Sequence, residues 1–343
     1  MNINLDYKEL FITAGAALVL TTVVLVLAGA PPIAACYHIF KGAFGTWSKF
    51  THVIKMWIPL TLCACGLLYT FKIGLWNIGV EGQIIIGAIC STAVLRTVTD
   101  TDWPWLFLGL SFFAGIAGGG IWALIAGYLK TRGGVNEIFA GLGLNFVAQG
   151  IILWLIFGPW KRPGVASMSG TELLPHNLWL PYISNIRISP TGLAFVIIGL
   201  ILTGFMLSHT RIGLNLKAIG RNEKAAFLFG LKPNRWFLLA MIFAGGFAGL
   251  AGSLQVSGVY HRLVPAISSS YGYLALLVVM LSNYKVSVAP WVALLFACLN
   301  QGSIQLPMML SLDSSLSGVI QGALVLATLA VHSWRKQRIE KVT

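Results

Sequence analysis

Residues Trp76–Gly87 read W-N-I-G-V-E-G-Q-I-I-I-G and carry an Asn, a Glu and a Gln between two long apolar runs. Those runs cover residues 56–71 and 84–98. An ionisable side chain such as Glu81 is costly at membrane depth and is usually kept there for a function. Glycines in and beside the stretch weaken a continuous helix and let another segment or a solute come close. These glycines are Gly74, Gly79 and Gly82.

The composition is that of a polytopic membrane protein. Of the 343 residues, 57% are hydrophobic and only 10% are charged, and the mean hydropathy is +0.82. Soluble domains carry about 25% charged residues. The longest polar interval, residues 160–189, is too short for a separate core. We therefore expect one transmembrane domain over residues 1–343.

Apolar runs of membrane-spanning length recur along the chain. A span needs about 20 apolar residues. Ten runs come near this length and predict an all-α polytopic fold with about ten transmembrane helices. They cover residues 10–29, 56–72, 83–99, 104–129, 137–158, 190–208, 236–256, 271–284, 288–306 and 314–332. Glycines four apart predict faces where two of these helices approach closely, at Gly115 and Gly119 and at Gly245 and Gly249.

Lys and Arg are unevenly distributed between the two sides of these spans. Fifteen lie on the side of the N-terminus and eight lie on the opposite side. By the positive-inside rule, both termini are expected in the cytoplasm. The same arrangement places a loop over about residues 209–235 in the cytoplasm and a loop over about residues 159–189 outside.

Missing patterns exclude several classes of function. The sequence contains no G-x-x-x-x-G-K-[ST], no H-E-x-x-H and no G-x-S-x-G. Its five cysteines and six histidines lack the spacing of metal ligands. The net charge of +13 comes from short loops, so a nucleic-acid partner is not expected. We expect no catalytic residue, no metal and no cofactor, and membrane lipid around the spans.

The loop Thr210–Arg235 is the second informative stretch. It is too polar to span a membrane, and its pattern predicts a short helix near Asn222–Phe229 that ends at Gly230, before Pro233. This helix offers apolar side chains flanked by basic residues. Two interpretations stay open on these residues alone: a knob for a groove on a partner protein, or an interfacial helix on anionic lipid.

Four motifs, in order along the chain, carry a family resemblance. They are N-I-G-V-E-G-Q at 77–83, G-V-N-E at 134–137 followed by Leu144-Asn145, G-L-N-L-K-A-I-G-R-N at 213–222 and A-A-x-x-x-G at 225–230. Together they resemble permeases of ATP-binding-cassette (ABC) importers, in the simple-sugar and nucleoside branch. The Glu-Gly-Gln of the first motif is similar to the nucleoside-type group served by basic-membrane-lipoprotein-like binding proteins. The chain departs from the ribose-type Asp-Leu-Ser-Val-Gly pattern there, and it has Lys224 where the family's coupling loop often has Glu.

The resemblance implies a heteromeric importer in a prokaryotic inner membrane. Two permease subunits would form the pathway, and separate ABC ATPase subunits would hydrolyse ATP. An extracytoplasmic substrate-binding lipoprotein would deliver the small-molecule solute. The nucleoside-type resemblance favours a paralogue as the second permease. Coupling to the ATPase would involve Arg221, Asn222, Lys224, Ala225, Ala226, Phe229 and Gly230.

Polar side chains between the apolar runs are candidates for the solute pathway. The candidates are Asn77, Glu81, Gln83, Asn145 and Gln149. Amides donate and accept hydrogen bonds, which suits a neutral solute that carries hydroxyls or a nucleobase. Glu81 either accepts from the solute or bonds to backbone amides freed where the helix breaks. Asn136 and Glu137 are expected to begin a helix instead.

The expected function is that of a permease subunit for a nucleoside or related small solute, with no enzymatic activity of its own. One alternative is the same architecture carrying a sugar or a flavin. The other, from a different class, is a secondary transporter that follows an ion gradient without ATPase subunits.

Overall fold

The structure is a computed structural model that describes residues 31–98, 103–162, 164, 170–183 and 188–304, with eight isolated positions nearer the chain ends. Every regular element within these ranges is a helix, which confirms the expected all-α fold. The first and last expected spans, 10–29 and 314–332, and both chain ends lie outside the continuous described ranges.

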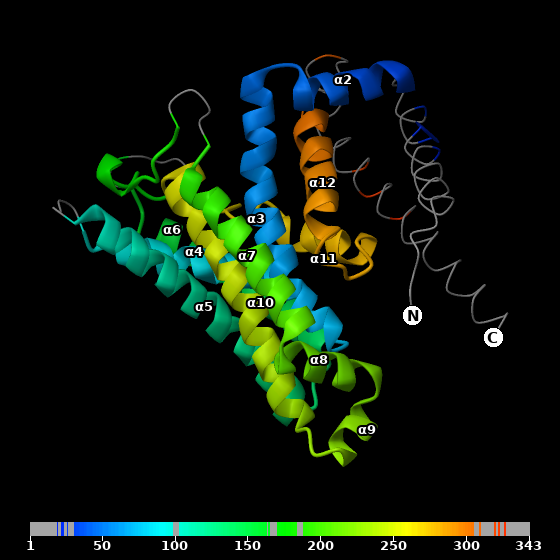
Figure 1. The fold of residues 1–343 in the computed structure, drawn as a ribbon. Helices are drawn as coiled ribbons and strands as arrows, with labels where there is room; N and C mark the ends of the chain where they lie inside the picture. Colours follow the sequence, from blue (N-terminus) through cyan, green and yellow to red (C-terminus); the bar gives the residue numbers. More distant parts are fainter. Residues whose placement is uncertain are drawn as a thin grey trace. The chain divides into compact units, whose positions relative to one another are not determined.

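Eight of the expected apolar runs coincide with helices (Figure 1). They are α3 (Trp47–Lys72), α4 (Val80–Arg96), α5 (Pro104–Gly133), α6 (Glu137–Phe157), α7 (Pro190–His209), α10 (Pro233–Gln255), α11 (Tyr271–Leu281) and α12 (Ala289–Ser303). Among the described residues, α3, α5, α6, α7 and α10 are long and apolar enough to cross a membrane, α10 with its continuation to Tyr260. The other three are shorter than the about 20 residues of a full span. The number ten and the cytoplasmic termini stay predictions.

The chain divides into two compact units. One comprises Met1–Val53 and Leu294–Thr343, and the other comprises Ile54–Ala293. In the first unit, α2 (Pro32–Phe44) lies against the end of α12. The contact is so close that a Cβ at Gly302 would overlap the Ile39 carbonyl oxygen. The expectation of a single domain over the whole chain stays a prediction.

Helices α4, α5 and α10 form the packed centre of the second unit (Figure 1). A Cβ at Gly249 of α10 would overlap the carbonyl oxygen of Gly115 in α5, and one at Gly245 would overlap that of Gly119. A Cβ at Gly87 of α4 would meet the Cα of Gly249. Small residues let helix backbones touch where lipid offers no hydrophobic driving force between helices. The expected small-residue faces are thus confirmed.

The polar loop between α7 and α10 contains two short helices, α8 (Arg211–Arg221) and α9 (Glu223–Leu228). The expected helix near Asn222–Phe229 is α9. Helix α8 was not expected, and it buries one face through Gly213, Leu216 and Ile219. These positions are three apart, so they share a face, but a glycine among them weakens the apolar signal in the sequence.

Candidate functional site

The predicted break in the chain lies between α3 and α4, at residues 73–79. Gly74 has a φ of +85°, a left-handed conformation that glycine adopts without a Cβ penalty. The Leu75 N–H then donates to the Thr70 carbonyl at 2.8 Å and closes the end of α3. The chain can therefore leave α3, make a short non-helical passage and begin α4 at Val80.

Asn77 and Gln83 join the two ends of this passage. The Asn77 Nδ2 donates to Gln83 Oε1 at 3.1 Å, and the Gln83 Nε2 donates to Asn77 Oδ1 at 3.0 Å. Both side chains are 1% exposed. A reciprocal amide pair satisfies one donor and one acceptor of each residue where water is excluded. This pair fixes the passage at the start of α4.

Glu81 lies in the first turn of α4, and its carboxylate reaches the first turn of α11. The Gly272 N–H donates to Glu81 Oε2 at 2.8 Å. The Ser268 side chain and the backbone N–H groups of Ser270 and Tyr273 also interact with this carboxylate. Glu81 therefore sits at two helix N-termini, its own and that of α11, where unpaired N–H groups favour a negative charge.

Asn145 of α6 forms hydrogen bonds with both the passage and the start of α4. Its Oδ1 accepts from the Gly82 N–H at 2.8 Å, and its Nδ2 donates to the Ile78 carbonyl at 2.9 Å and to the Tyr273 hydroxyl at 3.3 Å. One side chain thus links α6, the passage and α11. Gln149, one turn further along α6, donates from Nε2 to the Pro265 carbonyl at 3.2 Å.

The structure therefore brings Asn77, Glu81, Gln83 and Asn145 together around the start of α4, with Gln149 one turn away. We call these five side chains the polar cluster. Each forms hydrogen bonds within the protein, so the structural interpretation of Glu81 has direct support. Their role in a solute pathway stays a prediction.

Asn136 and Glu137 begin α6, as expected. The Asn136 Oδ1 accepts from the Ile138 N–H at 2.8 Å, and Glu137 pairs with Lys130 at the end of α5 at 2.7 Å. Sequence reasoning missed Trp122 of α5. Its indole N–H has no hydrogen-bond partner among the described residues and lies 3.1 Å from the position of a Cβ built on Gly82. No pattern in the sequence places α5 beside this turn.

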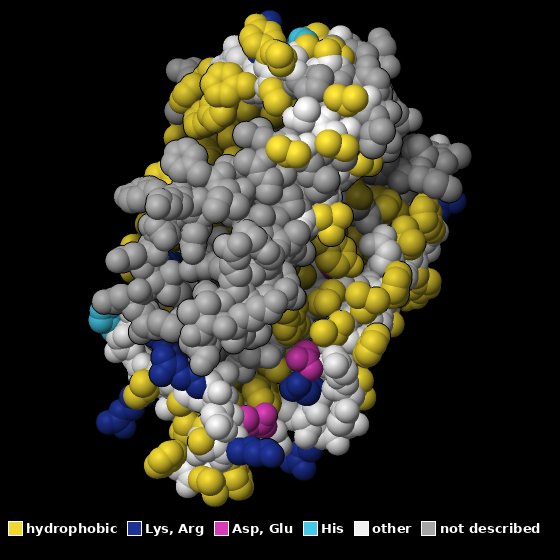
Figure 2. Space-filling view, turned by 90° about the vertical axis from the view of Figure 1, so that its right-hand side faces the viewer, with side chains coloured by type: hydrophobic (Ala, Val, Ile, Leu, Met, Phe, Trp, Pro, Cys, Tyr) yellow, Lys and Arg dark blue, Asp and Glu magenta, His cyan; other side chains and the backbone are white. Residues whose placement is uncertain are grey.

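The predicted coupling residues form the turn from α8 into α9. Asn222 caps α9 by accepting from the Ala225 N–H at 3.0 Å, and Gly230, with a φ of +86°, lets the chain leave it. Ala226 is buried, whereas the three side chains at the tip are exposed: Phe227 64%, Leu228 84% and Phe229 89%. Arg221 and Lys224 are exposed beside them. Figure 2 shows apolar side chains with Lys and Arg around them at the lower end of the molecule, where Figure 1 places α9.

Helix α8 connects this tip to the passage. A Cβ at Gly220 would overlap the Lys72 carbonyl oxygen and lie 3.1 Å from the Ile73 Cα. The end of α8 thus touches the backbone at the point where α3 ends and the passage starts. At its other end, Gly213 is equally close to the backbone of Leu207 in α7. Close-packed backbones transmit displacement because they leave no space to absorb it.

Long apolar helices, a buried polar break and a basic segment with an apolar tip are the features of a multi-pass membrane transport protein. Residues 50–329 match the family described as "Branched-chain amino acid transport system / permease component", and the chain belongs to this family. The chain is a permease subunit of the ABC importer class, as its motifs indicated.

Three relatives illustrate the range of this family. The glucose ABC transporter permease protein TsgB13 of Haloferax volcanii is 27% identical over 98% of this chain and 90% of its own length. The guanosine ABC transporter permease protein NupP of Bacillus subtilis is 24% identical over 87% of this chain and 85% of its own. NupQ, a second guanosine permease of Bacillus subtilis, is 26% identical over 69% of this chain and 76% of its own.

Replacing Glu81 tests the capping role. In Glu81→Ala the Gly272 N–H loses its acceptor in a buried position, which costs about 1–3 kcal/mol. We expect a lower melting temperature of the purified subunit in detergent, and a smaller loss for Glu81→Gln, which keeps one acceptor oxygen. The matched control is Glu223→Ala, which removes an exposed carboxylate from the first turn of α9. A Glu81→Ala subunit as stable as the control would contradict the capping role.

Proposed function

We propose that this chain is one of two permease subunits of an importer for a nucleoside or related small solute, driven by separate ATPase subunits. The observation that carries the proposal is the polar cluster at a break between apolar helices. The pathway side chains are Asn77, Glu81, Gln83, Asn145 and Gln149.

The amides of the polar cluster suit a solute with both donors and acceptors. An Asn or Gln amide has two N–H donors and an oxygen with two lone pairs. Asn77 and Gln83 each use one donor and one acceptor in their mutual pair. The remaining donor and acceptor of each match the edge of a nucleobase or a ribose hydroxyl. Such partial satisfaction binds a solute without holding it tightly, and a site on a transport path must also release it.

The α8–α9 segment, which we call the coupling segment, would couple closure of the ATPase subunits to movement of the solute pathway. The exposed tip of Phe227, Leu228 and Phe229 would enter a groove on the ATPase, with Arg221 and Lys224 at its rim. When the ATPase subunits close, displacement of α9 would pass through α8 to the end of α3, where Gly220 touches Lys72 and Ile73. The passage at 73–79 would then shift relative to α6 and α11, and the pathway would change the side to which it opens.

Partners follow from the same family. NupP and NupQ are two different guanosine permeases of one organism, and both are similar to this chain. This supports a paralogue as the second permease here. An extracytoplasmic binding lipoprotein would deliver the solute on the side opposite α9, and the membrane would be the prokaryotic inner membrane.

A sugar is the second candidate solute, and one observation favours it. TsgB13, named as a glucose permease, is similar to 98% of this chain. The amides of the polar cluster bind sugar hydroxyls as readily as nucleobases, so direct competition must decide.

Uptake in a host that lacks nucleoside transport tests the solute. The chain is expressed with its ATPase, its second permease and its binding protein, and radiolabelled guanosine uptake is measured. We expect saturable uptake that an ATPase-inactive variant abolishes and that excess glucose leaves unchanged. Glucose uptake without guanosine uptake would overturn the nucleoside assignment in favour of the sugar.

Replacing Phe229 with Asp tests the coupling role of α9. A charge at the centre of an apolar docking contact costs about 2 kcal/mol or more. We therefore expect at least about tenfold slower uptake and weaker recovery of the ATPase with the purified permease. Leu173→Asp, at an exposed position of the segment 170–183, is the matched control. If Phe229→Asp keeps its ATPase but loses binding to anionic vesicles, α9 is a lipid-surface helix instead.

A further inference from the structure

Helix α11 begins with a serine that does not cap it. Ser270 occupies the N-cap position but has a φ of +59°, a left-handed conformation, and its side chain forms no cap hydrogen bond. A serine cap needs an extended backbone, from which the side-chain oxygen accepts an N–H of the first turn. Ser189 has that geometry before α7, where it accepts from the Gly192 N–H. The same kind of cap begins α6, α8 and α9, with Asn136, Thr210 and Asn222.

Glu81 of α4 caps α11 in place of this serine. The Gly272 N–H, which an N-cap serine would ordinarily bind, donates to Glu81 Oε2 at 2.8 Å. The same carboxylate interacts with the Ser268 side chain and with the backbone N–H groups of Ser270 and Tyr273. The two helix starts are in close contact, since a Cβ at Gly272 would lie 2.9 Å from the Glu81 Cα. The first turn of α11 therefore depends on a side chain from another helix.

The turn before α11 has a strained backbone. Ser269 and Ser270 are consecutive left-handed residues, with φ of +47° and +59°. This conformation is unfavourable for residues other than glycine and persists only where the surrounding structure imposes it. The Ser269 hydroxyl lies 3.0 Å from the Tyr260 hydroxyl, whereas Ser270 is exposed to solvent. Because Glu81 occupies the first-turn donors, Ser270 gains no cap hydrogen bond by becoming extended.

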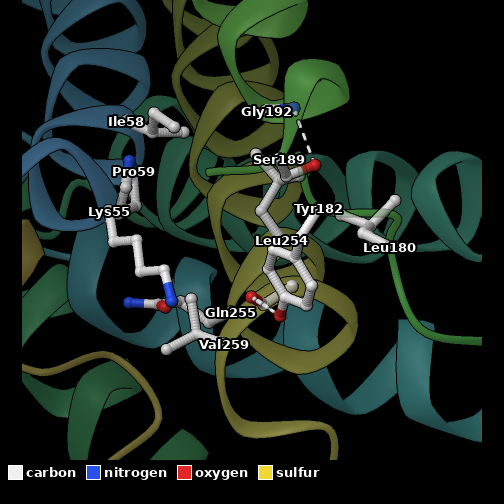
Figure 3. Close-up of a pocket in the computed structure, with 11 residues that line it drawn as sticks. Lys55, Ile58, Pro59, Leu180, Tyr182, Ser189, Gly192, Leu254, Gln255 and Val259 are labelled. Atoms are coloured by element: carbon white, nitrogen blue, oxygen red, sulfur yellow. Dashed lines mark hydrogen bonds between the residues drawn. The ribbon is translucent and has the colours of Figure 1, made fainter. Parts of the chain in front are cut away.

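The chain between α10 and this turn is anchored to the segment 170–183. The Thr171 N–H donates to the Leu263 carbonyl at 2.9 Å, and the Leu263 N–H donates to Thr171 Oγ1 at 3.1 Å. The Tyr182 hydroxyl donates to the Gly258 carbonyl at 2.6 Å, beside a cavity of about 30 Å³ (Figure 3). That cavity lies between α3, the segment 170–183, the start of α7 and the end of α10. Rotation at the left-handed turn therefore moves α11 and leaves the end of α10 in place.

We propose that α11 exchanges its cap during transport: Ser270 becomes extended and caps the helix, and Glu81 is released to accept from the solute. The inference rests on the proposed function, in which the passage shifts relative to α11. In that movement the Gly272 N–H loses Glu81, and the Ser270 hydroxyl replaces it as acceptor. The released carboxylate needs a new donor, which a nucleobase N–H or a sugar hydroxyl supplies. The two roles of Glu81, cap and solute acceptor, then belong to two states of one cycle.

Ser270→Ala removes the alternative cap and leaves Glu81 in place. Loss of one serine cap changes an equilibrium about fivefold, so the state with released Glu81 becomes less populated. We expect the Vmax of guanosine uptake, or of glucose uptake if the wild type carries the sugar, to fall about fivefold. Ser270→Thr keeps a capping hydroxyl and should stay within about twofold of the wild type. Ser287→Ala, at an exposed position of the turn after α11, is the matched control and should equal the wild type.

Hydrogen exchange of the assembled transporter separates this inference from the proposed function, because it needs no solute. Closing the ATPase with nucleotide should change exchange of the peptide covering residues 268–275 in the wild type. In Ser270→Ala this change should shrink while α8 responds as before. A response of α8 with none over residues 268–275 would overturn the cap exchange alone, and no response in either segment would overturn the ATPase coupling as well. Equal uptake by Ser270→Ala and Ser287→Ala would also overturn the cap exchange.

Discussion

Glu81 is 7% exposed in an apolar part of the chain, so hydrogen-bond donors of the protein must replace the water that solvates a carboxylate at a surface. Two helix N-termini supply these donors. Glu81 lies in the first turn of α4 and accepts from the Gly272 N–H in the first turn of α11. A helix N-terminus stabilises a nearby anion by about 0.3–1 kcal/mol, and by more when partly buried. This hydrogen bond holds the start of α4 against α11, and it thereby fixes the position of the passage at residues 73–79, which precedes α4.

The rest of the second unit follows from that constraint. Asn145 holds the passage against α6, and the Asn77–Gln83 pair holds it to the first turn of α4. Glycine contacts hold α4 against α5 and α10. The contact of Gly220 with Lys72 and Ile73 joins this assembly to α8. In the proposed function this short non-helical passage is the gate, because its backbone can change conformation without breaking a helix. The coupling segment reaches the passage without crossing the glycine-packed centre.

Much of this could be predicted from the sequence, for identifiable reasons. The length of the apolar runs predicts eight of the described helices, Gly230 predicts the end of α9, and Asn136 predicts the start of α6. The partner of Glu81 was not predictable, since Gly272 lies 191 residues away and one sequence does not reveal which helices are neighbours. The small cavity between α3, the segment 170–183, the start of α7 and the end of α10 was equally hidden, because four separate segments meet around it.

The most direct test of the account is hydrogen exchange of the assembled transporter in lipid, with and without a nucleotide that holds the ATPase closed. The account predicts that exchange of the peptide covering residues 73–83 changes with nucleotide, together with that of α8, because the two segments are in backbone contact. The peptide covering residues 244–253 of α10, packed through glycines, should stay protected in both states. A change in α8 with unchanged exchange over residues 73–83 would contradict the claim that the coupling segment moves the polar passage.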